Sequence, residues 1–354
     1  MNYICTMKTL FCYGFFALGL TSLFSQYTDQ INSNRPGVSI GAFAVGKRVV
    51  QIESGFAFQN HNHAGYNQST FNAGISFLSV RWGFWSERLE LTYQGAYLKG
   101  TTKSKVASLP KSTTNKGLVE NFLGVKFLLY DPFKKERKTN VYSWKANNGF
   151  KLRDLLPAVS LTLGANVQLG KQPYPYRNYF ASLYRPLFYQ NIRNPLEKEP
   201  FLHSRATLAT QTHFLRSWVL VTNFSYHRFP SDYPEMNYIV TLTHTLNPLW
   251  SLYVENEGRY SDLFRNNLIR GGVAYLWSDD LQIEATLGAN TKNKPSMLFV
   301  NAGISYRFDF HKDFISAAEI EAKSLKKEEK QVKKAIRKNG KTEKKRNRKA
   351  KRRN

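Results

Sequence analysis

Apolar and polar residues alternate along the stretch 297–310, MLFVNAGISYRFDF. Every second residue from Leu298 to Phe308 is apolar, whereas Asn301, Ser305 and Arg307 lie at the positions between. A period of two places the two sets on opposite faces of a β-strand. One face suits lipid and the other suits water. We therefore predict that this stretch crosses a membrane as the closing strand of a β-barrel.

Eleven earlier segments of about ten residues alternate in the same way, as transmembrane strands do. Together with the closing strand, the predicted strands cover residues 47–59, 69–82, 88–99, 117–130, 157–169, 204–213, 217–227, 237–246, 250–261, 268–277, 281–290 and 297–309. A soluble β-sandwich would also alternate, so alternation alone does not settle the class. The fold class we predict is all-β: an antiparallel transmembrane β-barrel of about twelve strands.

The connections between the segments favour the membrane protein, because short turns alternate with longer loops. The short turns are 85–87, 215–216, 247–248 and 278–280. This is the pattern of periplasmic turns and extracellular loops in outer-membrane barrels. An even number of strands then puts both termini in the periplasm. All six tryptophans lie on the side of the short turns, as an aromatic girdle requires: Trp82, Trp85, Trp144, Trp218, Trp250 and Trp277.

Composition limits the alternatives further. No apolar run reaches the length of a transmembrane helix, which needs about 20 residues. The net charge is +26, and residues 311–354 contribute +12 of it, with 18 Lys or Arg against 6 Asp or Glu. Much of the basic charge is therefore appended to the barrel and does not form a folded nucleic-acid-binding face.

The first segment, residues 1–25, has Lys8 followed by an apolar run to Phe24 and is predicted to be a secretory signal peptide, with Met7 as an alternative start. A short membrane anchor is the alternative. Cys5 and Cys12 are the only cysteines, so cleavage near Ser25 removes disulfides and thiolate chemistry from consideration. Residues 26–46 are predicted to be an N-terminal periplasmic segment, residues 47–310 the barrel, and residues 311–354 a basic periplasmic tail.

Charged residues at inward positions of the strands are the lumen or constriction candidates, since a Lys or Arg at the lipid midplane costs about 2 to 4 kcal/mol. They are Glu53, Glu90, Lys126, Arg205, Glu255, Glu257, Arg259, Arg270, Glu284 and Arg307. Both signs occur together. Two interpretations stay open: a network of paired charges that fills the lumen, or a constriction that selects solutes. Twelve strands permit a pore without guaranteeing one.

The long loop 171–203 interleaves aromatic and arginine residues, which could stack on a ligand or pack the loop on the barrel mouth. Its outer-loop ligand candidates are Tyr174, Tyr176, Arg177, Tyr179, Tyr184 and Arg185. His61 and His63 could ligate a metal but have no third ligand beside them, so we predict no metal. No nucleophile, zinc or phosphate-loop motif occurs, so we predict no cofactor and no enzyme activity.

The tail from residue 315 favours a helix that ends at Asn339-Gly340, with a thin apolar stripe. It is either a solvated helical or disordered appendage, or it binds a periplasmic protein or peptidoglycan. The partner-binding candidates are Leu325, Val332, Ile336, Lys344, Lys345 and Arg346. A cytosolic protein with this basic run would suggest nucleic acid, but the signal peptide removes that context.

The stretches 33–36, SNRP, and 46–56, GKRVVQIESGF, resemble the opening of the outer-membrane family named for the MetA pathway of phenol degradation. Asn34 stands where that family usually has an aspartate. Shorter similarities follow at 81–84, 88–91, 124–127 and 253–255. The resemblance covers residues 33–310 and implies a secreted β-barrel described as a transporter, with aromatic or hydrophobic compounds as suggested cargo. The basic tail is a departure from the family.

The function expected from the sequence is a porin-like or transporter-like barrel in the outer membrane of a Gram-negative bacterium, passing small, hydrophobic or aromatic solutes. Its expected partners are outer-membrane lipid, the solute, and a periplasmic protein or peptidoglycan at the tail, with no nucleic acid. The alternative is a non-conducting structural subunit of an envelope complex, in which the barrel anchors the tail.

Overall fold

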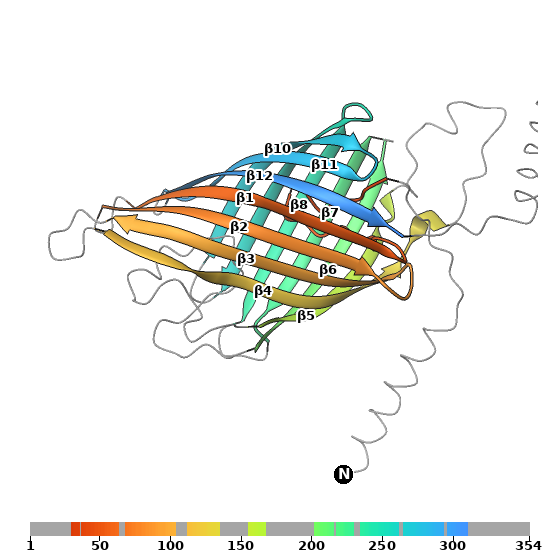
Figure 1. The fold of residues 1–354 in the computed structure, drawn as a ribbon, viewed down its shortest axis with the longest axis horizontal. Coiled ribbons are helices and arrows are strands. Elements are labelled where there is room, and N and C mark those ends of the chain that lie inside the picture. Colours follow the sequence, from red (N-terminus) through yellow and green to blue (C-terminus); the bar gives the residue numbers. More distant parts are fainter. Residues whose placement is uncertain are drawn as a thin grey trace, which may run out of the picture. The chain divides into compact units, whose positions relative to one another are not determined.

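A computed structural model describes residues 30–35, 37–63, 68–103, 112–134, 155–167, 202–215, 217–229, 234–261, 265–293 and 296–310. They form a closed antiparallel barrel in which each strand pairs with its sequence neighbours and the last strand pairs with the first (Figure 1). The strands are β1 Val49–His63, β2 Ser69–Gly83, β3 Leu89–Lys103, β4 Ser112–Tyr130, β5 Ala158–Val167, β6 Leu202–Phe214, β7 Trp218–His227, β8 Glu235–Thr245, β9 Trp250–Ser261, β10 Arg265–Ser278, β11 Leu281–Asn290 and β12 Ser296–Asp309. A short 3-10 helix, η1 Pro132–Lys134, follows β4.

The predicted fold class and all twelve predicted strands are confirmed. We call the end of the barrel where β1 begins and β12 ends the turn end, and the opposite end the loop end. Strands extend beyond their predicted bounds mainly at the loop end, where β1 continues to His63, β3 to Lys103 and β4 starts at Ser112. These extensions are polar on both faces, so they lack the alternation that marks the membrane-spanning parts.

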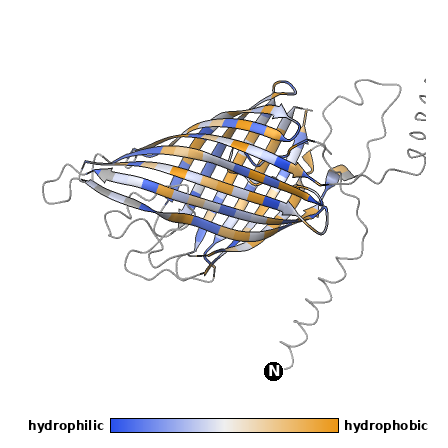
Figure 2. Cartoon of the chain, in the orientation of Figure 1, coloured by the Kyte–Doolittle hydropathy of each residue, from blue (hydrophilic) through white to orange (hydrophobic). Residues whose placement is uncertain are grey.

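The two faces of the wall differ as the alternation requires. Along β12, Leu298, Val300 and Ile304 are about half exposed on the outside, whereas Ser305 and Arg307 are buried inside. The alternating colours along the strands show the same division around the barrel (Figure 2). An outer surface of this kind belongs in hydrocarbon, and a closed barrel leaves no strand edge unpaired there.

Exposed aromatic side chains mark both rims of the apolar surface. Trp82, Trp85, Trp250 and Trp277 are between 42% and 74% exposed at the turn end. Toward the loop end, Tyr97, Tyr226, Tyr238 and Tyr260 are exposed on the outer surface. Within the residues that the structure describes, no helix is long and apolar enough to cross a membrane. The basic tail predicted for residues 311–354 and the predicted signal peptide lie outside the described residues.

Candidate functional site: the lumen and its N-terminal segment

Residues 31–35 and 37–45, which precede β1, lie inside the barrel. We refer to residues 31–45 as the inner segment; all but Pro36 are described. It starts at the turn end, where the Ile31 amide donates to the carbonyl of Asp279 at 2.7 Å. The inner segment lies within residues 26–46, which we predicted to be an N-terminal periplasmic segment. It is hydrogen-bonded to inward side chains from nine of the strands.

A charged cluster on β2, β3 and β4 holds both ends of the inner segment. The Arg81 guanidinium binds the Glu90 carboxylate through two bonds of 2.8 and 2.9 Å, and Lys126 Nζ lies 3.2 Å from the same carboxylate. Arg81 also donates to the carbonyl of Asn32 at 2.8 Å, and Lys126 to that of Phe43 at 2.8 Å. The three side chains are at most 1% exposed.

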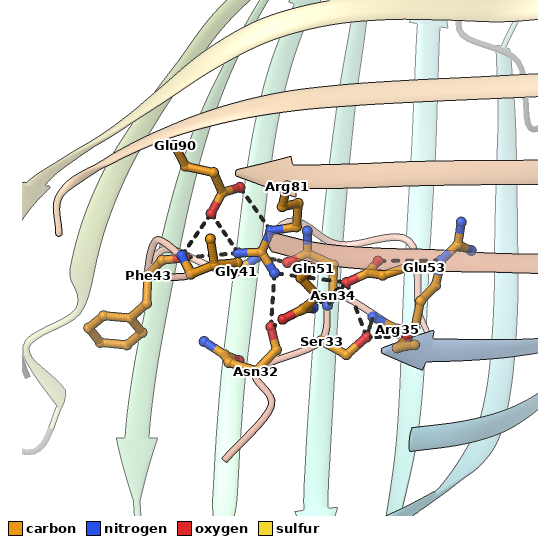
Figure 3. A network of polar contacts seen from close by, with 12 residues as sticks. Asn32, Ser33, Asn34, Arg35, Gly41, Phe43, Gln51, Glu53, Arg81 and Glu90 are labelled. Atoms are coloured by element: carbon orange, nitrogen blue, oxygen red, sulfur yellow. Dashed lines mark hydrogen bonds and ion pairs between the residues drawn. The ribbon is translucent and has the colours of Figure 1, made fainter. Parts of the chain in front are cut away.

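Glu90 completes this cluster by accepting a hydrogen bond from the Val45 amide at 2.9 Å. The two cations therefore bind backbone carbonyls of the segment while their counter-ion binds a backbone amide. Figure 3 shows Arg81 between Glu90 and the segment residues Asn32 and Phe43. Such a set of donors and acceptors satisfies buried charges that would otherwise be costly.

Glu53 on β1 forms the second anchor (Figure 3). Its carboxylate accepts bonds from the Ser33 hydroxyl at 3.2 Å, the Asn34 amide at 3.1 Å and the Gln51 side chain at 2.7 Å. The Ser33 hydroxyl oxygen also lies 2.9 Å from that of Ser305 on β12. The segment is thus fixed to the seam where the barrel closes.

The third anchor lies on the far wall, on strands β6, β7 and β9. Glu255 accepts from the amides of Val38 at 3.1 Å and Ser39 at 3.2 Å. Asn223 binds Ile40 in both directions, through the amide at 2.6 Å and the carbonyl at 2.8 Å. Gln211 accepts from the Ala42 amide at 3.0 Å. The segment therefore spans the lumen from one wall to the other.

The physical reason for this arrangement is mutual satisfaction of polar groups. An irregular backbone has amides and carbonyls that need partners when they are buried. The inward faces of the strands supply carboxylates, amides and cations at that depth, and the segment supplies the complementary groups. The part of the lumen next to the turn end, which we call the turn half, is consequently filled.

The part of the lumen next to the loop end, the loop half, has a different wall. Its β1–β4 side is apolar, with a buried cluster that includes Phe71, Ile75, Leu98 and Val119, against which Phe77 packs. Leu268, Met297 and Phe299 form a second apolar cluster on β10 and β12. Inward apolar residues depart from the usual rule that barrel interiors are polar.

Two cavities border the inner segment on its loop-half side. One, of about 100 Å³, is lined by Ile75, Phe77 and Phe299 together with Arg35 and Arg270. The other, also of about 100 Å³, contacts Arg35 too and extends to Glu257 and Arg259. The Arg35 guanidinium carbon lies 3.8 Å from the centre of the Phe77 ring, so the segment contributes a cation to the cavity wall.

Charged residues of β6, β9 and β10 also line this part of the lumen. Arg270 binds Glu255 at 2.9 Å and also contacts Glu257, which in turn binds Arg259 at 2.7 Å. Arg205 binds Glu120 at 3.0 Å and stacks on Phe122. The cavities thus lie between an apolar surface and a surface of paired charges.

The structure places all ten lumen candidates on the inner face, each at most 5% exposed: Glu53, Glu90, Lys126, Arg205, Glu255, Glu257, Arg259, Arg270, Glu284 and Arg307. Nine of them form ion pairs with other described residues. The outer-loop candidates and the tail candidates lie outside the described residues: Tyr174, Tyr176, Arg177, Tyr179, Tyr184, Arg185, Leu325, Val332, Ile336, Lys344, Lys345 and Arg346.

Sequence analysis missed the inner segment and Arg81. The parity of β2 points Arg81 inward, so alternation could have identified it. The segment itself has no periodic pattern. Its SNRP stretch, 33–36, pointed to the family, and the many inward charges of the strands were the signal that the lumen holds partners for them. His61 is buried on the inner face, 3.1 Å from Gln59, and the described residues contain no group of three or more His, Cys, Asp or Glu suited to a metal ion.

The apolar exterior, polar interior and closed hydrogen bonding define the class of protein as a transmembrane β-barrel, and we assign it to the outer membrane. The chain belongs to the family described as "Putative MetA-pathway of phenol degradation", whose model matches residues 33–182 and 203–308. The resemblance found in the sequence is confirmed. A comparison with curated proteins gives no match.

Solved barrels with distant similarity include an outer membrane channel from Pseudomonas putida F1, at 13% identity and a TM-score of 0.45, covering 79% of this chain and 100% of that one. The translocator domain of the autotransporter NalP from Neisseria meningitidis has 6% identity and a TM-score of 0.42, with 78% and 90% covered. The NanC porin has 7% identity and a TM-score of 0.40, with 71% and 98% covered.

Proposed function

We propose that the protein is a channel for small solutes and that the inner segment is its constriction. The observation that carries the proposal is the segment itself, which crosses the lumen, donates backbone hydrogen bonds to Glu53, Glu90 and Glu255, and borders two cavities. Solutes enter the loop half and pass through the turn half when some of these hydrogen bonds break and the inner segment moves.

The solute class we propose has an apolar or aromatic body and a polar end. Phe77 and Phe299 offer rings to the body, while Arg35 and Arg270 offer donors to the polar end. A pocket of this kind, mostly apolar with a few polar groups, is typical of small-molecule sites. The short turns would face the periplasm, and the loop end the outside.

A reversible tether tests the constriction. Ser33 and Ser305 touch through their hydroxyl oxygens at 2.9 Å, so the double variant S33C/S305C should form a disulfide with little movement. The only native cysteines are Cys5 and Cys12. We expect the oxidised variant in planar bilayers to conduct at least about tenfold less than the same protein after reduction, because segment motion is needed for passage.

The matched control is T207C/S225C, whose hydroxyl oxygens also lie 2.9 Å apart but belong to paired strands β6 and β7 of the wall. Its conductance should not change on reduction. Equal conductance of oxidised and reduced S33C/S305C would show that solutes bypass the segment.

The solute class is tested by uptake into liposomes that contain the protein. Benzoate should enter faster than gluconate, and equal uptake of the two contradicts the proposed solute class.

A second candidate is a non-conducting structural subunit, which the filled turn half favours. Here the barrel would anchor the basic tail, with Leu325, Val332, Ile336, Lys344, Lys345 and Arg346 contacting a periplasmic protein or peptidoglycan. The discriminating result is a complete absence of conductance in both the wild type and a variant lacking residues 31–45. Loss of a co-purifying envelope protein on deletion of residues 315–354 would support this candidate further.

A further inference from the structure

The outer face of β3 and β4 carries exposed lysines at the loop end. Lys99 and Lys116 are partners in the β3–β4 register, so their side chains lie directly opposite each other. The next outward pair toward the middle of the barrel is Tyr97 and Leu118, which are 43% and 40% exposed. The two lysines therefore lie at the edge of the apolar surface.

Within the described strands, no acidic side chain pairs with these lysines. The sequence from residue 99 to residue 116 contains five lysines and no Asp or Glu. Among the described residues, neither Lys99 nor Lys116 forms an ion pair. Like charges directly opposite on neighbouring strands destabilise a sheet. An anion bound between them would remove that cost.

Hydroxyl and amide groups lie beside the lysines on the same outer face. Thr101 and Thr114 form the next outward pair, with their hydroxyl oxygens 3.3 Å apart. Asn72 on β2 is the register partner of Thr101 and accepts a bond from Asn60 at 2.5 Å. These groups add neutral hydrogen-bond donors to the positive charge, which suits the oxygens of a phosphate.

We propose that Lys99 and Lys116, with Thr101 and Thr114, bind the phosphate of an anionic membrane lipid in the leaflet around the loop end. The choice of a lipid over a soluble anion follows from position, because the exposed apolar residues Tyr97 and Leu118 adjoin the lysines on the membrane side and can contact acyl chains. Basic residues close to an anionic membrane surface attract it. The inference concerns the outer face and is independent of the lumen.

The test measures lipid binding by native mass spectrometry of the full barrel in detergent, with diphosphorylated lipid A as the probe. K99Q/K116Q should lose about 30-fold in affinity, an order-of-magnitude expectation for two charges. The control K292Q removes an exposed lysine after β11 and should change affinity less than twofold. Dephosphorylated lipid A should bind the wild type and K99Q/K116Q equally.

A second measurement stays informative if a variant alters folding efficiency. In neutral detergent, K116Q should raise the apparent melting temperature, because it removes the repulsion from Lys99. In bilayers containing lipid A, it should lower that temperature, because it removes a ligand of the phosphate. The proposal is overturned by a shift of the same sign in both media, by unchanged lipid A affinity in K99Q/K116Q, or by an equal loss in K292Q. Competition by inorganic phosphate at concentrations similar to those of lipid A would also overturn it, since it would identify a soluble anion as the ligand.

Discussion

The two halves of the lumen differ in the contacts that their inward side chains make. In the turn half, buried charges such as Glu90 and Lys126 are satisfied by the backbone of the inner segment. In the loop half, the β1–β4 wall carries an apolar cluster and adjoins two cavities of about 100 Å³ each. Hydrogen bonds to buried charges hold the inner segment in place in the turn half. In the loop half, the apolar wall adjoins space for a solute.

The largest expected effect comes from breaking the charged cluster of the turn half. Glu90→Gln should lower the free energy of unfolding by about 3 to 5 kcal/mol, because Arg81 and Lys126 remain buried without their counter-ion. Urea unfolding in lipid vesicles, followed by tryptophan fluorescence, measures it. A loss below about 1 kcal/mol would show that the cluster does not hold the segment.

The next effect concerns the apolar wall of the loop half. Phe77→Ala should cost about 2 kcal/mol of stability, less than a fully buried ring, since Phe77 is only partly buried. It should also weaken the affinity for benzoate about fivefold, measured as block of single-channel current. Phe58→Ala is the control, because Phe58 is 53% exposed on the outer face of β1. An equal loss of benzoate affinity in that control would contradict the assigned cavity.

A smaller effect is expected at the ion pair of Glu120 and Arg205 in the loop half. The Glu120 side chain is 21% exposed, against 1% for Glu90. Water therefore compensates part of the ion-pair energy that is lost when Glu120 is replaced. Glu120→Gln should lower the free energy of unfolding by about 1 kcal/mol. If the loss equals that of Glu90→Gln under the same conditions, the proposed contrast between the halves is wrong.

The smallest effect tests a residue that contacts both halves. Arg35 lies on the inner segment, and its guanidinium stacks on Phe77. Arg35→Lys keeps the charge but loses the planar contact, so the unfolding free energy should fall by about 0.5 to 1 kcal/mol. Combining it with Phe77→Ala should add almost nothing to the cost of Phe77→Ala, and a fully additive pair of losses would exclude the stacking contact as the cause.

Alternation in the sequence determined the strands and the direction of most side chains. The inward positions of Glu53, Lys126 and Arg270 followed from parity, because a charge on the lipid face is costly. Parity is a local property of the chain, so it needs no knowledge of distant partners. The strand ends at the loop end were underestimated for the same reason, since these extensions are polar on both faces and do not alternate.

Tertiary structure alone decided what fills the barrel. The residues around Ser33 and Ile40 have no periodic pattern, and their partners lie as far away in sequence as Ser305 and Asn223. Such contacts exist only after the barrel has closed and brought its inward faces together. Parity also points Phe71 and Phe299 inward, but it does not say that their side chains form an apolar wall beside a cavity. The sequence by itself therefore determined a twelve-stranded membrane barrel with charges inside. Only the closed barrel brings those charges close enough to one another to bind the inner segment.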